Sequence, residues 1–139
     1  MATLTNSAVN TRKLLYLVPI AGLAAAILNA ILFLIGSSTG AFSPDYINPN
    51  TGQPITVGPV IMASIVPALV AGILLALLNR FTKNPLKIFN IIALVVFVLM
   101  FATPLMLPNA PMGMVVILEL MHVVVAGVVV WVFNKYAKN

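Results

Sequence analysis

The stretch MVVILELMHVVVAGVVVWVF, Met114 to Phe133, is an almost unbroken apolar run. About 20 residues of α-helix cross the hydrocarbon core of a bilayer, so the run predicts a membrane-spanning helix. It carries Glu119, one of two acidic residues in the chain, and His122, the single histidine. At this spacing the two side chains share a helix face. An ionisable pair inside such a segment indicates a candidate functional site.

The composition of the whole chain supports a membrane protein. Of its 139 residues, 62% are hydrophobic and 6% are charged, whereas roughly 25% of a soluble domain is charged. The net charge is +5. Basic residues lie at the ends of apolar runs instead of clustering on one element, which argues against nucleic-acid binding. The chain has no cysteine, which excludes disulfides and thiolate metal sites and leaves the redox compartment open.

Three further apolar runs accompany the first, so the predicted spans are 14–36, 57–78, 88–107 and 114–133. The first exceeds the 7–15 apolar residues typical of a signal peptide, which favours an uncleaved helix. Residues 1–13 and 134–139 form short tails around a membrane domain, 14–133. The loop 37–56 is rich in Gly, Pro, Ser and Asn, and the turn-forming residues 48–52 predict a short hairpin within it. We expect an all-α membrane protein, an up-down four-transmembrane-helix bundle.

The distribution of basic residues predicts the orientation. Four spans alternate in direction, so both termini and the 79–87 turn share one side of the membrane. All seven basic residues fall on that side: Arg12, Lys13, Arg80, Lys83, Lys87, Lys135 and Lys138. The positive-inside rule assigns it to the cytoplasm, so both termini are expected to be cytoplasmic.

Small residues at four-residue spacing indicate where the helices approach one another, because lipid supplies no hydrophobic drive for association. The first span carries Gly22, Ala26 and Ala30, the second carries Ser64, Ala68, Gly72 and Ala76, and the fourth offers Ala126 and Gly127. These stripes are expected to face inward. Prolines at 19, 67 and 104 each remove a backbone donor inside a predicted span, although membrane helices commonly carry proline.

Four polar residues are expected at similar depth: Asn29, Ser64, Glu119 and His122. Counted from the outer end of each span, they lie roughly 7–12 Å below the boundary. In a structural interpretation, Glu119 and His122 bond each other and Asn29 or Ser64, fixing the helix register. In a functional interpretation, the layer handles a proton or cation or anchors a small ligand. A third alternative is a site completed by a partner chain.

Metal and catalytic chemistry have weak support. Di-iron carboxylate bundles use two Glu-x-x-His pairs and two further glutamates, and this chain has one pair. We therefore predict no metal, no cofactor and no catalytic residue, and lean against an enzyme. The favoured function is a non-enzymatic binding or accessory protein with a polar pocket around Glu119 and His122. The alternative is a small oligomeric transporter or proton-coupled conduit. Expected partners are the lipid bilayer and either further copies of the chain or a larger membrane complex, without nucleic acid.

Short motifs along the chain add a resemblance. They are the Pro/Gly/Ala-containing first span, the loop Asn50-Thr-Gly-Gln-Pro54, Leu77-Leu-Asn-Arg80 at the end of the second span, and Leu120-Met-His-Val-Val124. The chain is similar to a small bacterial family of four-span membrane proteins of unknown function. The resemblance covers most of the chain and implies a four-helix protein of the bacterial inner membrane. It implies no activity.

Overall fold

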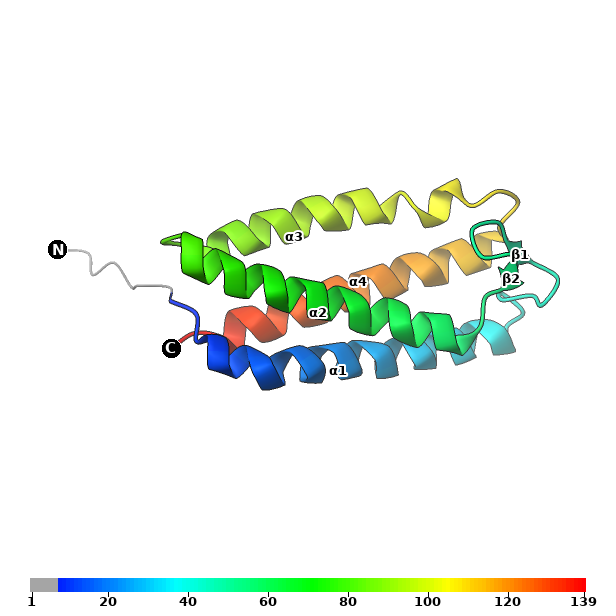
Figure 1. The fold of residues 1–139 in the computed structure, drawn as a ribbon. Helices are drawn as coiled ribbons and strands as arrows, with labels where there is room; N and C mark the ends of the chain where they lie inside the picture. The colour runs from blue at the N-terminus through cyan, green and yellow to red at the C-terminus, as the bar shows by residue number, and fades with distance from the viewer. Residues whose placement is uncertain (1–7) are drawn as a thin grey trace.

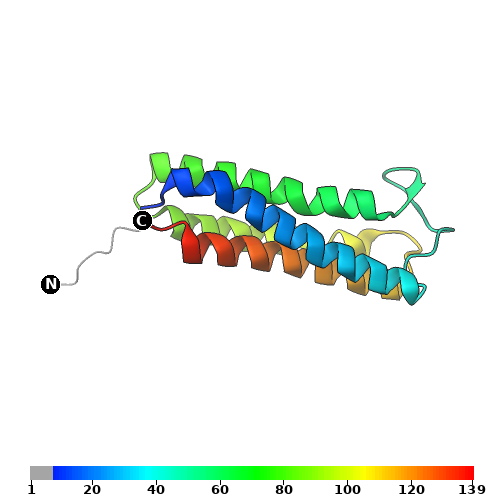
Figure 2. The same ribbon diagram turned by 90° about the horizontal axis from the view of Figure 1, so that it is seen from below.

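Four long antiparallel helices form one bundle in the computed structural model, which describes residues 8–139 (Figure 1). They are α1 (Thr11–Ser38), α2 (Val57–Phe81), α3 (Pro85–Phe101) and α4 (Met112–Tyr136). Each lies in a segment long and apolar enough to cross a membrane. The prediction of an all-α four-helix membrane bundle is confirmed. Helix α1 packs most closely against α2 and α4, and α3 rests more loosely on α2 and α4 (Figure 2).

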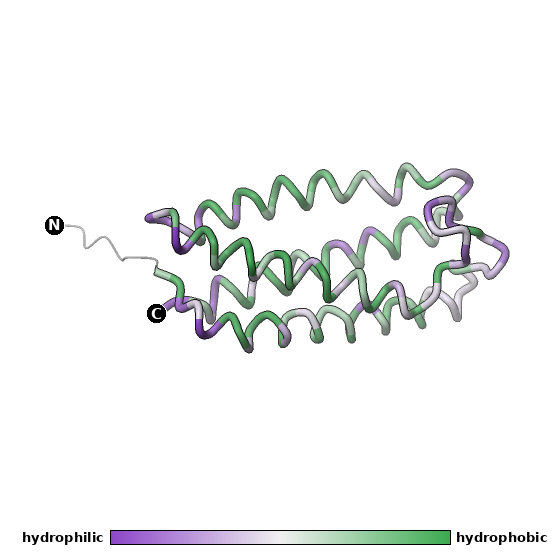
Figure 3. The backbone as a smooth tube through the Cα atoms, in the orientation of Figure 1, coloured by the Kyte–Doolittle hydropathy of each residue, from purple (hydrophilic) through white to green (hydrophobic). Residues whose placement is uncertain are grey.

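Hydrophilic residues gather at the two ends of the bundle, while the lengths of the helices are mostly hydrophobic (Figure 3). The first described residues, 8–10, the C-terminus and the α2–α3 turn lie at one end, where the basic residues are. The outward surface of the helices carries large exposed apolar side chains, such as Leu15, Ile73 and Leu99. Water solvates such a surface poorly, whereas lipid covers it.

The third span contains a break. Helix α3 begins with Pro85 in its first turn, a position that needs no backbone donor, and it ends at Phe101. A short 3-10 helix, η1 (Pro104–Met106), follows. Pro104 has no backbone N–H to donate to the preceding turn, so the regular helix stops short of the predicted boundary at 107. The Met100 carbonyl accepts two hydrogen bonds from Thr103, one from the backbone N at 3.0 Å and one from Oγ1 at 2.7 Å.

The loop of residues 39–56, between α1 and α2, folds over the end of the bundle opposite the basic residues. It contains β1 (Ile47–Asn48) and β2 (Gln53–Pro54), which pair antiparallel and confirm the predicted hairpin. Gly52 has a φ of +68°, which glycine adopts without steric cost. Phe42 is buried, with its ring centroid 4.8 Å from that of Phe33 on α1. The loop therefore closes the end of the helices opposite the basic residues.

The seam between α1 and α2 is built from small residues, as predicted. Ser64 and Ala68 are fully buried. A Cβ added at Gly22 would lie 3.4 Å from the Ala68 Cβ, and one at Gly72 would collide with Val18. On α4, Gly127 is exposed, and a Cβ there would meet nothing within 4 Å. The close approach therefore joins α1 to α2, and Gly127 does not contribute an inward-facing contact.

The two chain ends are joined at the basic end of the bundle. Val9 forms an antiparallel bridge with Lys138, and the Asn10 amide donates to the Ala137 carbonyl at 2.8 Å. The Asn79 side chain on α2 accepts from Val9 N and donates to Val9 O, both at 2.9 Å. Asn79 thus ties the segment before α1 to α2.

Candidate functional site

Asn29 of α1 and Ser64 of α2 form a buried polar contact, with exposed fractions of 2% and 0%. Asn29 Nδ2 donates to Ser64 Oγ at 2.9 Å and to the Met121 carbonyl of α4 at 3.3 Å. Ser64 Oγ donates to the Val60 carbonyl at 2.8 Å. Asn29 Oδ1 is buried and has no partner among the described residues. The pair ties three helices together and leaves one acceptor free.

Glu119 has a different environment. The residue is half-buried, but both of its carboxyl oxygens are buried, and neither has a hydrogen-bond partner in residues 8–139. His122 is bonded within its own helix, with Nδ1 2.7 Å from the Leu118 carbonyl oxygen. A carbonyl can only accept, so Nδ1 carries the hydrogen and Nε2 remains available. The Glu119–His122 hydrogen bond of the structural interpretation does not form.

A helical projection places Glu119 and His122 on the same face of α4 as Phe133. Phe133 packs on Phe89 of α3, with ring centroids 5.6 Å apart. At about 100° per residue, Glu119 and His122 lie within roughly 40° of the direction of Phe133. Met121, whose carbonyl meets Asn29, lies on the other side of the helix. The structure therefore joins Asn29 to Ser64, while Glu119 and His122 lie on a different face of α4 from Met121.

Glu119 lies level with the break in the third span. Asn134 of α4 bonds Asn90 of α3, which fixes the antiparallel register. From Asn134 to Glu119 the helix rises about 22 Å, and the same distance along α3 from Asn90 reaches the region of η1. Helix α4 contacts η1. Between Ile91 and Phe101, α3 has no polar side chain, so it offers no side-chain donor to the carboxyl group.

The region around Glu119 offers hydrogen-bond acceptors that have no donor among the described residues. The Glu119 oxygens can receive a proton, an N–H group or a cation, and His122 Nε2 lies on the same face of α4. Three protein ligands are the usual minimum for a catalytic zinc site. Residues 8–139 hold no group of three His, Asp or Glu side chains that could bind a metal. The arrangement is suited to recognising a donor-bearing group.

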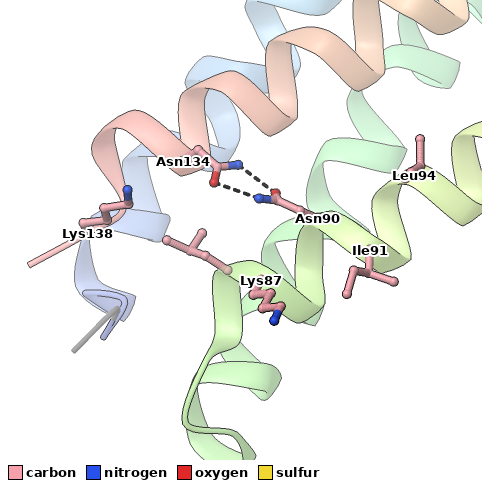
Figure 4. Close-up of a pocket in the computed structure, with 7 residues that line it drawn as sticks. Lys87, Asn90, Ile91, Leu94, Asn134 and Lys138 are labelled. Atoms are coloured by element: carbon pink, nitrogen blue, oxygen red, sulfur yellow. Dashed lines mark hydrogen bonds between the residues drawn. The ribbon is translucent and has the colours of Figure 1, made fainter. Parts of the chain in front are cut away.

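A groove lies at the opposite, basic end, between α3 and α4 (Figure 4). Its volume is about 500 Å³, and it is lined by Leu86, Lys87, Asn90, Ile91, Leu94, Asn134 and Lys138. Asn90 Nδ2 donates to Asn134 Oδ1 at 3.0 Å, and Asn134 Nδ2 donates to Asn90 Oδ1 at 2.8 Å. Sequence reasoning did not identify this groove. The signal available was one asparagine near the basic end of each of two apolar runs.

Comparison with known proteins gives a family match without an activity. A family model described as a family of unknown function (DUF6069) matches residues 9–139. The search of curated proteins and the search of solved structures found no match.

Proposed function

The chain belongs to this family of unknown function, DUF6069, and we propose that it is a non-enzymatic integral membrane protein that binds a small hydrogen-bond-donating ligand at Glu119. It would do so alone or as an accessory subunit of a membrane complex. One observation carries the proposal: both Glu119 carboxyl oxygens are buried without a partner among the described residues.

The energetic cost of this arrangement supports a role beyond packing. A buried acceptor without a donor costs about 1–3 kcal/mol, and an ionised carboxylate costs more. Helix α3 carries no polar side chain from Ile91 to Phe101, and the Oγ1 of Thr103 donates to the Met100 carbonyl. A leucine at position 119 would therefore lose no hydrogen bond to this part of the chain and would remove the cost. Ionisable residues within spans commonly serve ligand or ion recognition. The geometry favours a cationic or N–H-bearing group, which would satisfy the carboxyl oxygens.

The proposed setting follows from the charge pattern. The basic end, with both termini, is assigned to the cytoplasm and the hairpin end to the outside of a bacterial inner membrane. Glu119 is nearer the hairpin end, so the ligand would enter from the outer side. His122 Nε2 provides a second polar contact on the same face. Asn29 and Ser64 act at similar depth by holding α1, α2 and α4 together.

Transport is the alternative to ligand binding. A conduit needs polar groups along its whole length. Toward the basic end, the amides of Asn90 and Asn134 bond each other, and Asn79 bonds the Val9 backbone. In the part of the chain that the structure describes, Glu119 thus has no polar continuation toward the basic end, and transport would require an oligomer. Its signature is pH-dependent uptake by vesicles containing the protein, lost in Glu119→Gln.

Native mass spectrometry of protein extracted gently from its own membrane tests the binding proposal. We expect a bound small molecule or partner that is lost in Glu119→Gln. Asp45→Asn is the matched control, because Asp45 is the other acidic residue and lies exposed in the outer loop. Retention of the same species by Glu119→Gln would refute the proposal, as would a wild-type spectrum showing only protein and bulk lipid.

Glu119→Leu separates binding from packing. Removing two unsatisfied acceptors should raise the midpoint of thermal unfolding, while the bound species disappears. A variant that is more stable and also supports growth or membrane function of the host like the wild type would show that the carboxyl group has no ligand.

A further inference from the structure

The groove between α3 and α4 combines a polar floor with an apolar wall. The Asn90–Asn134 pair forms the floor (Figure 4). Asn134 Nδ2 uses both hydrogens, donating to Asn90 Oδ1 and to the Val130 carbonyl, each at 2.8 Å. Among residues 8–139, Asn90 Nδ2 makes a single bond, to Asn134. Its second hydrogen therefore remains for an oxygen of a bound molecule.

Two lysines flank this floor at the mouth of the groove. Lys87 belongs to the first turn of α3, and Lys138 follows the end of α4; both are exposed. Their four-carbon stems allow either ammonium group to turn over the groove. Lys13 adds a third positive charge nearby, since its Nζ donates to the Lys138 carbonyl at 2.6 Å. None of the described residues that line the groove is acidic, so its mouth is positively charged.

The mouth lies where headgroups of one leaflet are expected. Trp131 and Tyr136 pack edge to face near the same end, with ring centroids 5.6 Å apart, and Lys135 Nζ lies 4.9 Å from the Trp131 centroid. Tryptophan, tyrosine and lysine favour the membrane interface. From Lys87 to Leu94, α3 descends about 10 Å, which leads from headgroup level into the hydrocarbon region.

The apolar wall continues the groove into the membrane. Ile91 and Leu94 are exposed by 55% and 62%. The buried residues of α3 are Pro85, Leu86 and Phe89, all at its basic end. Beyond Asn90, none of the residues of α3 is buried. The seam beside α4 thus presents apolar side chains to whatever fills it.

From this combination we propose that the groove binds one anionic phospholipid. The phosphodiester lies between Lys87 and Lys138, and an oxygen of the glycerol or phosphate accepts the second hydrogen of Asn90 Nδ2. An acyl chain follows Ile91 and Leu94. Basic pockets between helices at a membrane surface bind anionic headgroups in this manner. The site is separate from Glu119 and does not depend on its function.

Lipid titration of the purified full chain in neutral detergent tests this proposal. Phosphatidylglycerol and phosphatidylcholine with identical acyl chains are added separately, and one-to-one adducts are measured by native mass spectrometry. The groove variant is Lys87→Gln with Lys138→Gln. Its matched control is Lys83→Gln with Lys135→Gln, which removes the same charge from the same end without altering the groove lining. Leu94→Trp obstructs the apolar wall without changing the charge.

The wild-type chain should bind phosphatidylglycerol in preference to phosphatidylcholine. The groove variant should bind phosphatidylglycerol about thirtyfold more weakly than the wild type, because each lysine near a membrane contributes roughly fivefold to the affinity for an anionic lipid. The control pair should change affinity less than threefold, and Leu94→Trp should weaken both lipids. Equal losses in the groove and control variants would overturn the proposal and assign the effect to general surface charge. An absence of preference for the anionic lipid would also overturn it.

Discussion

Replacing Gly72 by alanine should destabilise the protein, although the same replacement at Gly127 should stabilise it. Both glycines lie inside long helices, α2 and α4. At Gly72 a new Cβ would collide with Val18 Cγ2 and lie 3.4 Å from Val18 Cβ and Cγ1. At Gly127 it would meet nothing within 4 Å. The local helix change is identical, so the difference isolates the seam between α1 and α2.

The magnitude follows from two opposing terms. Alanine is favoured over glycine in a helix by about 1 kcal/mol. Overpacking a core costs about 1–3 kcal/mol. The upper end applies at Gly72, because Val18 is buried and its branched side chain has one preferred rotamer in a helix. We expect Gly72→Ala to lower the free energy of unfolding by about 2 kcal/mol, and Gly127→Ala to raise it by up to about 1 kcal/mol.

Equilibrium unfolding in mixed micelles of neutral detergent and dodecyl sulfate, followed by circular dichroism, measures both variants. Val18→Ala combined with Gly72→Ala provides the internal check, because removing the two γ-carbons relieves the collision. The double variant should show a favourable coupling energy of at least about 1 kcal/mol relative to the two single changes. If Gly72→Ala matched Gly127→Ala in sign and size, the close seam between α1 and α2 would be refuted.

Two further predictions concern polar contacts within the bundle. Asn29→Leu removes the hydrogen bonds to Ser64 and to the α4 backbone. It should lower the free energy of unfolding by about 1 kcal/mol in the same assay, the usual contribution of hydrogen bonds between membrane helices. An unchanged free energy of unfolding would contradict the contact. Asn79→Leu removes both bonds to Val9 and should speed amide hydrogen exchange at residues 8–10, measured by mass spectrometry, with the hairpin 47–54 as the unaffected reference. Equal exchange in variant and wild type would show that Asn79 does not hold the chain end.

The positions of the helix ends show how far local rules extend. Pro85 and the run after it predict a helix start within a few residues, and the hairpin was expected from its turn residues. The end of α3 was not, because Pro104 can either kink a helix or end one. Here Thr103 donates two hydrogen bonds to the Met100 carbonyl, and the α-helix ends before Pro104. Helix η1 also contacts α4, and no local sequence pattern contains that contact.

The candidate site shows the same division. Depth along a helix follows from counting residues at a fixed rise, so the similar levels of Asn29, Ser64 and Glu119 could be predicted. The rotation of α3 and α4 could not be predicted, since these helices are apolar on nearly all sides and give no reliable signal for the inward face. The small-residue stripes of α1 and α2 did indicate the faces that meet. The Asn90–Asn134 pair was missed for a related reason. Two amides 44 residues apart meet only when two helices adopt one register.

By itself the sequence determined a membrane protein of four helices with alternating direction, because span length and hydropathy are set by the thickness of the bilayer. It also determined that all basic residues lie at one end. Only the tertiary structure decided which faces of α3 and α4 are inside, that Asn29 bonds Ser64 while Glu119 has no donor among residues 8–139, and that a groove opens beside α3. Lipid is as apolar as the side chains of these helices, so it does not favour the burial of one helix face over another. Which face turns inward therefore depends on close packing between particular side chains.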